Sequence, residues 1–120
     1  MNHDELARRA VKSPHWRWMP GMRWRTDDDA GRLDDYQPEY MGRPSDALPD
    51  LTDPATVGCL YALLREHWGG HCFAIANGFE AEDEVWSVHD GRFGGDGYGH
   101  MIAVGSTEVE ALVKALGVEP

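Results

Sequence analysis

The chain has 120 residues, with 11 basic and 21 acidic side chains and a formal charge of −10 at pH 7. No apolar run approaches the roughly 20 residues of a membrane-spanning helix, and the two cysteines are too few for a disulfide scaffold. These features argue against membrane-spanning and disulfide-rich classes and predict a soluble, cytoplasmic protein with a single domain over 1–120.

Charge is distributed unevenly along the chain. Residues 1–32 contain seven basic and five acidic side chains, whereas 33–120 contain four basic and sixteen acidic ones, so the two parts have net charges of +2 and −12. The acidic body disfavours direct binding to nucleic acid, because that affinity comes from cations that neutralise phosphates. A protein partner with a basic surface, or a cation, suits the body better.

The first predicted element is a short helix near 4–11. Asp4 and Glu5 stand in its first turn, where acidic groups favour the helix dipole, and Pro14 disfavours its continuation. The segment HWRWMPGMRWR follows at 15–25, and the Pro-Gly pair in its middle predicts a turn. Two short strands around this turn and an irregular arm lying on the core are both compatible with this composition.

The charged run at 26–35 is predicted to be a solvated loop, and it completes an N-terminal region over 1–35 formed by the helix and a basic, Trp-rich arm. A connection over 36–52 follows, in which prolines and weak periodicity predict irregular, partly polyproline-like backbone. A segment of this length without secondary structure is unusual in a compact domain and is often functional.

The central predicted element is a helix over 53–68, around which the rest of the chain is expected to pack. Asp53 fits the N-cap and Pro54 the first helical position. Apolar residues recur on one face at helical spacing: Val57, Leu60, Tyr61, Leu64 and Trp68. Cys59 and Leu63 point away from this face, so we expect the Trp-rich arm to cover them, with a homodimer contact as the alternative.

Three strand-like runs follow at 71–77, 84–90 and 99–105, and their short connections favour antiparallel pairing. A capping box of Thr107 and Glu110 predicts a closing helix near 107–116. The body over 53–117 therefore has the order α-β-β-β-α. The predicted fold is α+β, a two-layer domain with a three-stranded antiparallel sheet and the two later helices on one face.

Patterns for catalytic chemistry are weak. His67, His71, Cys72 and His89 are candidate zinc ligands, but no CxxC pair or HExxH motif accompanies them. The glycine-rich loop at 91–99 lacks the GK[ST] of a P-loop, and no serine lies in a nucleophile-elbow motif. The sequence therefore predicts no enzymatic activity, no bound metal and no cofactor; a small zinc-dependent enzyme is the rival interpretation.

Two sets of residues are candidates for recognition. The first is the arm, whose composition resembles base-stacking segments, although a structural role is favoured for its tryptophans and arginines: Trp16, Arg17, Trp18, Arg23, Trp24 and Arg25. The second combines acidic residues that would steer a basic protein with apolar anchors in loops: Glu80, Glu82, Asp83, Glu84, Tyr36, Tyr40, Met41, Phe79 and Phe93.

The pattern over 49–117 is similar to a known class of small proteins. The run PDLTDPAT before the long helix, Trp86 in the middle strand and the closing TEVEALVKAL resemble phage and prophage proteins of the ABA-sandwich type. The resemblance implies a phage context and supplies no catalytic residues. We therefore expect a non-enzymatic interaction protein, in particular a counter-defence inhibitor that presents its acidic surface to a basic, nucleic-acid-binding host protein. The alternative is a virion or assembly accessory protein that self-associates.

Overall fold

The structure is a computed structural model that describes residues 2–33, 43–76, 85–91 and 99–118. The elements in chain order are α1 (His3–Lys12), β1 (Arg23–Arg25), β2 (Ala30–Arg32), β3 (Leu48–Pro49), α2 (Pro54–Trp68), β4 (Phe73–Ala76), β5 (Trp86–His89), β6 (Met101–Gly105) and α3 (Glu108–Leu116). These helices and two three-stranded antiparallel sheets confirm the predicted α+β class.

The helices begin where the sequence supplies a capping side chain. The carboxylate of Asp53 accepts a hydrogen bond of 3.0 Å from the amide of Thr56 at the start of α2. The hydroxyl of Thr107 does the same for the amide of Glu110 at the start of α3, at 3.1 Å; Asn2 caps α1. Each cap satisfies an amide without an intrahelical partner. All three predicted helices are confirmed to within one residue at each end.

The C-terminal sheet has the strand order β4-β5-β6, with antiparallel neighbours. The predicted meander is therefore confirmed, including the pairing of the last two strands. The register between β5 and β6 shifts after Val88, so that Val88 opposes Ala103 whereas His89 opposes Met101. Ile102 is the extra residue at this bulge, and it packs against the core.

The N-terminal sheet was not predicted. Its central strand β1 pairs antiparallel with β2 and β3, so that Trp24 opposes Gly31 on one side and Pro49 on the other. A Cβ atom on Gly31 would lie 2.8 Å from the Trp24 ring, so glycine leaves the space that the indole occupies. Pro49 is tolerated because β3 is an edge strand.

This second sheet corrects two predictions. The run at 26–35 is not all loop, since β2 lies within it, and β3 lies within the connection predicted over 36–52. The strand interpretation of 15–25 holds only for β1, which pairs with later strands and not across the Pro-Gly turn. Strands of two or three residues are too short to show the alternation by which strands are recognised in a sequence.

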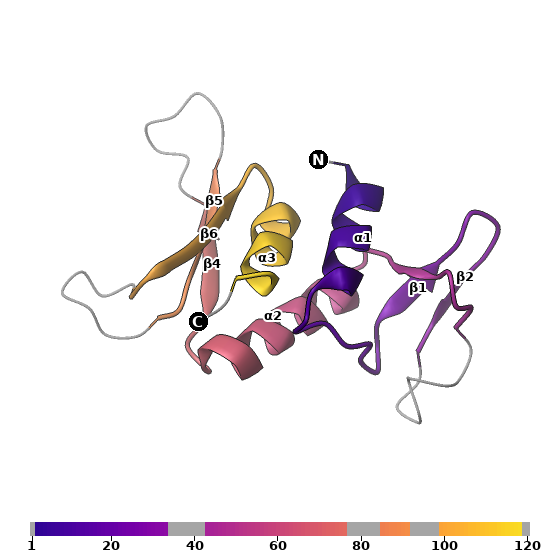
Figure 1. Cartoon of the computed structure of the whole chain (residues 1–120), viewed down its shortest axis with the longest axis horizontal. Coiled ribbons are helices and arrows are strands. Elements are labelled where there is room, and N and C mark those ends of the chain that lie inside the picture. Colours follow the sequence, from indigo (N-terminus) through magenta and orange to yellow (C-terminus); the bar gives the residue numbers. More distant parts are fainter. Residues whose placement is uncertain (1, 34–42, 77–84, 92–98, 119–120) are drawn as a thin grey trace.

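Helix α3, rather than α2, lies at the centre of the molecule. It contacts all three strands of the C-terminal sheet and both other helices. Figure 1 shows it between that sheet and α1, with α2 running below. Six of its nine residues are buried: Glu110, Ala111, Leu112, Val113, Ala115 and Leu116. The expectation that α2 packs directly on the strands is therefore corrected, because its most extensive contact is with α3.

The Trp-rich segment contacts the side of α2 that contains Cys59. The Cys59 Sγ lies 3.7 Å from the Pro20 carbonyl oxygen, and the Arg23 amide donates a 2.9 Å hydrogen bond to the Thr56 hydroxyl. Leu63 is only 2% exposed in the single chain. The homodimer contact through Cys59 and Leu63 stays a prediction, to which Leu63, buried within the single chain, would contribute little surface.

Candidate functional site

The C-terminal sheet has an inner face toward α3. Opposed residues in antiparallel strands share a face, and successive residues alternate between faces. The row of Ala74, Val88 and Ala103 belongs to the inner face, where Val88 is completely buried. Gly105 lies on the same face, and a Cβ atom there would be 2.5 Å from the Ala111 amide nitrogen in α3. Helix and sheet are therefore in close backbone contact.

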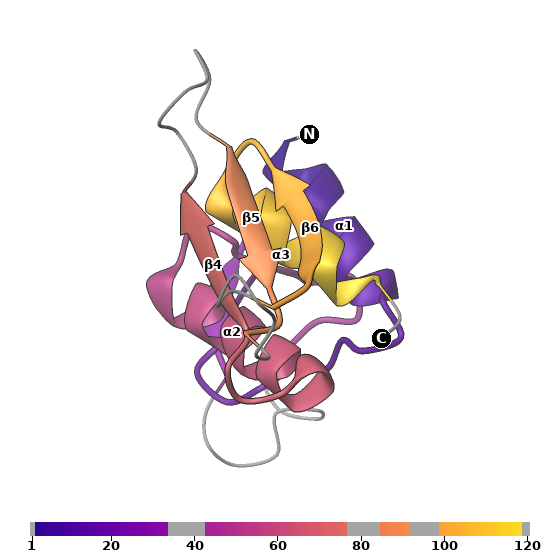
Figure 2. The same ribbon diagram turned by 90° about the vertical axis from the view of Figure 1, so that its left-hand side faces the viewer.

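The outer face of the sheet points away from α3 and consists of the residues that alternate along each strand with those of the inner face. Figure 2 views the sheet from this side, with the three strands in front of α3. The outer face consists of Phe73, Ile75, Ser87, His89, Met101 and Val104. Within the described part of the chain, Met101 and Val104 are the large apolar side chains most open to solvent, at 61% and 43%. A largely apolar surface is thus exposed on a sheet.

The polar residues of the outer face are engaged with their neighbours. The His89 ring stacks on Phe73, with 5.5 Å between centroids and 19° between planes. The Ser87 hydroxyl lies 2.9 Å from His89 Nε2. Because Ser87 is only 1% exposed, this pair lacks the accessible nucleophile that covalent catalysis requires. The outer face therefore suits contact with another surface better than it suits chemistry.

The outer face is too small to support a stable complex by itself. Three strands of four or five residues, spaced about 4.8 Å apart with about 3.3 Å per residue, cover about 200 Å². A standard interface buries about 800 Å² on each partner. The outer face alone is therefore smaller than a standard interface. In the sequence, the stretch that joins β4 to β5 includes Glu80, Glu82, Asp83 and Glu84.

All nine residues predicted to bind a partner lie outside the described residues: Tyr36, Tyr40, Met41, Phe79, Glu80, Glu82, Asp83, Glu84 and Phe93. Their order in the chain still relates some of them to the outer face. The residues from Phe79 to Glu84 connect β4 to β5, and Phe93 belongs to the connection from β5 to β6.

The predicted recognition arm is held to the body by ion pairs. Arg17 donates two hydrogen bonds to Glu66 of α2, one of them 2.6 Å long. This bidentate contact, chiefly through hydrogen bonding, lowers the pKa of the Glu66 carboxyl. Arg23 pairs with Asp50 at 3.2 Å, and Arg25 pairs with a carboxylate of α1.

The tryptophans of the arm are also engaged in the fold. Trp24 is only 7% exposed. Trp16 and Trp18 meet edge to face with 5.3 Å between ring centroids, and the Arg43 guanidinium lies 4.7 Å from the Trp18 ring centroid. These contacts favour the structural interpretation of the arm over base stacking.

The candidate metal ligands are not brought together. In the residues that the structure describes, no group of three or more His, Cys, Asp or Glu side chains is placed to hold a metal ion. His67 stacks on His15 with 3.4 Å between centroids, and His89 belongs to the outer face. Burial raises the pKa of the Cys72 thiol to about 11, which keeps it protonated at neutral pH.

The outer face was missed as a site because its signal in the sequence is ambiguous. Phe73 and Ile75 alternate in β4, as a face-forming pair should, but Ala74 and Val88 on the inner face are apolar as well. Alternation alone cannot tell which of two apolar faces is covered. The bulge at Ile102 also interrupts the pattern in β6.

No protein-family model, curated protein or solved structure matches this chain. No helix in the described ranges is long and apolar enough to cross a membrane. The resemblance of 49–117 to phage ABA-sandwich proteins therefore stays an expectation from sequence pattern, and a proposal about function must rest on the chain's own residues.

Proposed function

We propose that this protein is a non-enzymatic interaction module that binds a protein partner with a basic surface through the outer face of the C-terminal sheet. The observation behind the proposal is the exposure of Met101 and Val104 on the side of the sheet opposite α3. Contiguous exposed apolar surface is typical of docking sites on soluble proteins. These two side chains of β6 are the proposed central contacts, and Phe73 lies on the same face across His89 of the middle strand.

The charge of the chain favours a foreign partner over a second copy. Residues 33–120 have a net charge of −12, and four of the acidic residues lie between β4 and β5 in the sequence. A symmetric pair of copies would bring two strongly acidic bodies together, which like-charge repulsion opposes. A basic partner would instead be attracted, and its association rate would rise.

Nucleic-acid-binding proteins are the partner class that best meets this requirement, because their binding surfaces are basic. By occupying such a surface in the host cytoplasm, the protein would exclude nucleic acid from it. This is the mechanism expected of a counter-defence inhibitor from a phage. The alternative, a virion or assembly accessory protein, would use the outer face to contact copies of itself.

The test is site-specific cross-linking of the folded chain in host extract, with a photoreactive amino acid in place of Val104. We expect one predominant partner whose own surface binds nucleic acid, and we expect added nucleic acid to compete for it. Capture should fall as salt is raised, since ions screen the attraction between exposed charges.

Matched variants separate the outer face from general charge. Met101→Lys places a charge in the proposed contact and should abolish capture, whereas Ala55→Lys adds the same charge at an exposed position of α2 and should preserve it. Reversing the charges of Glu80, Glu82, Asp83 and Glu84 should slow association. A defined homo-oligomer in sedimentation, with no host partner, would support the assembly role instead.

A further inference from the structure

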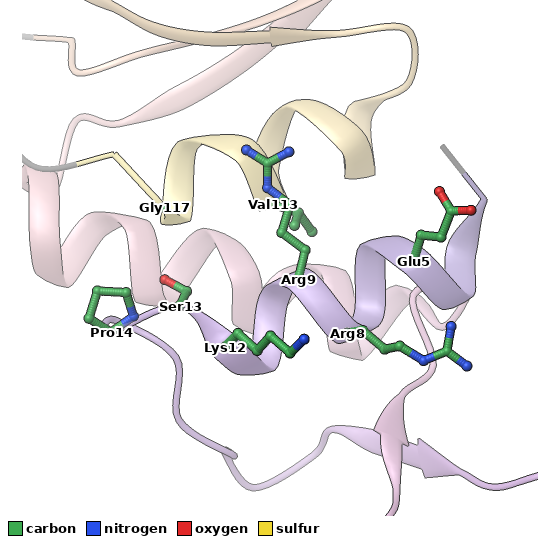
Figure 3. A pocket seen from close by; sticks show the side chains of 8 residues that line it. All are labelled: Glu5, Arg8, Arg9, Lys12, Ser13, Pro14, Val113 and Gly117. Atoms are coloured by element: carbon green, nitrogen blue, oxygen red, sulfur yellow. The ribbon is translucent and has the colours of Figure 1, made fainter.

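A pocket of about 550 Å³ lies between α1 and the C-terminal end of α3 (Figure 3). Helix α1 runs on the side of α3 away from the sheet (Figure 1). This volume falls within the roughly 300–1,000 Å³ typical of small-molecule sites. Arg8, Arg9 and Lys12 line it from α1, and Pro14 and Val113 supply apolar wall. The pocket thus combines cations with an apolar surface.

The cations of this pocket differ from most of the other basic side chains. Five basic groups elsewhere in the described chain are paired with carboxylates: Arg17 with Glu66, Arg23 with Asp50, Arg25 with Asp4, Arg32 with Asp53 and Lys114 with Glu110. Arg65 instead donates a hydrogen bond to the Cys72 carbonyl and lies over the Tyr61 ring. Within the described residues, no such ion pair holds Arg8, Arg9 or Lys12, although the chain has 21 acidic side chains for 11 basic ones. Among the described residues, these three cations therefore have no carboxylate within ion-pair distance, although Asp4 attracts Arg8 from farther away.

A hydrogen bond connects the two helices that form the walls of the pocket. The Ser13 hydroxyl donates a 2.8 Å hydrogen bond to the Leu116 carbonyl, which fixes the end of α1 against the end of α3. Figure 3 shows Arg9 extending beside Val113, while Arg8 and Lys12 project from neighbouring turns of α1. Like charges four residues apart destabilise a helix slightly, so their placement calls for a reason.

Helix electrostatics explain only part of this arrangement. Arg9 and Lys12 stand in the last turn of α1, where cations are favourable for the helix dipole. That effect fades within one turn and does not involve the apolar wall of Pro14 and Val113. Glu5 also lines the pocket, so the four charged side chains of the lining have a net charge of +2. An anion with an apolar part would match this lining.

We propose that the pocket binds a small organic phosphate. The phosphate oxygens would accept hydrogen bonds from Arg9 and from Arg8 or Lys12, because guanidinium groups match phosphate geometry and tolerate partial desolvation. The apolar part of the ligand would lie on Val113 and Pro14. This site is separate from the outer face and does not depend on the proposed protein partner.

The experiment is an NMR titration of amide resonances of the full chain with phenyl phosphate, and separately with phenol, at constant ionic strength. We expect phenyl phosphate to produce saturable shifts at the end of α1 and at Gly117, and phenol to produce none. Arg9→Gln should weaken binding at least about tenfold, as the loss of a charged hydrogen bond implies. Lys12→Gln is a second variant if Arg9→Gln does not fold.

Two further variants complete the design, one with the same charge change as Arg9→Gln and one with the opposite change. Arg17→Gln removes a cation outside the pocket from an exposed ion pair and should leave the affinity unchanged. Glu5→Gln removes the acidic group of the lining and should tighten binding. The proposal is overturned if phenyl phosphate gives no saturable shifts, if phenol binds equally well, or if Arg17→Gln weakens binding as much as Arg9→Gln. A lower melting temperature for Arg9→Gln without phosphate binding by the wild type would assign the cations to the helix dipole alone.

Discussion

The two three-stranded sheets lie at opposite ends of the molecule (Figure 1). They differ in whether the side chains that neighbour their buried residues have contacts within the same chain. In the N-terminal sheet, Trp24 is buried, and Arg23 and Arg25 on either side of it are held by carboxylates. In the C-terminal sheet, Val88 is buried, whereas Met101 and Val104 on the opposite face are apolar and exposed.

This difference separates a sheet whose charged side chains are paired within the chain from one that leaves apolar side chains exposed to solvent. In the N-terminal sheet, the arginines of β1 form ion pairs and the Trp24 indole is buried, all through contacts within the same chain. The C-terminal sheet packs against α3 on one side, and on the other side it leaves Met101 and Val104 exposed. Four substitutions test this contrast, from the largest expected effect to the smallest.

Trp24→Ala should give the largest loss of stability. The indole is buried between two neighbouring strands and above Gly31, and deleting a buried aromatic side chain costs about 3–5 kcal/mol of unfolding free energy. Chemical denaturation followed by circular dichroism measures the loss. Trp18→Ala, at a half-buried ring, should cost clearly less. Equal losses would mean that Trp24 is not the anchor of the N-terminal sheet.

Gly105→Ala tests the contact between the C-terminal sheet and α3. The new methyl group would lie 2.5 Å from the Ala111 amide nitrogen, so backbone must shift. Overpacking of this kind costs about 1–3 kcal/mol, which the same denaturation experiment detects. Gly58→Ala is the control: nothing lies within 4 Å of its added methyl group, and it should stabilise α2. An unchanged stability for Gly105→Ala would contradict the close approach of β6 to α3.

Asp53→Asn tests the ion pair that joins β2 to α2. Arg32 contacts the Asp53 carboxylate at 2.7 Å, and this contact, first among several, holds the pKa of that carboxyl well below its usual range. A lowered pKa stabilises the fold fully above the unfolded value of about 3.9, and this contribution is lost progressively as the pH falls from that value through the lower pKa of the folded state. We expect the variant to lose about 1 kcal/mol at pH 7, as is typical for a weakened charged contact.

The same substitution should flatten the acid limb of the stability curve. Denaturation at a series of pH values between neutral and strongly acidic measures that slope for both proteins. If wild type and Asp53→Asn lose stability in parallel as the pH falls, the carboxylate does not contribute to the acid sensitivity of the N-terminal sheet.

Met101→Lys should have the smallest effect on folding. The side chain is 61% exposed on an edge strand, and substitutions at such positions usually change stability by no more than about 0.5 kcal/mol. A normal melting temperature together with lost partner capture would identify the outer face as a binding surface. A large drop in melting temperature would show instead that the outer face belongs to the folded core.

The sequence predicted the C-terminal half of the fold better than the N-terminal half. Its strands have four or five residues, enough to be visible as runs between turn signals, and the short connections imply antiparallel order. The N-terminal strands have two or three residues, and β1 pairs with β3 although 22 residues, 26–47, separate the two strands in the chain. Such pairing leaves no local signature.

By itself, the sequence determined the three helices, because caps such as Asp53 and Thr107 act on amides only three residues away. It also determined the acidic character of the body, which depends on composition alone. Only the tertiary structure decided that α3 is the central helix and that the outer face is the uncovered one. Both outcomes depend on which apolar surfaces pack together. Because hydrophobic attraction is non-directional, an apolar pattern in the sequence does not show which other element will cover it.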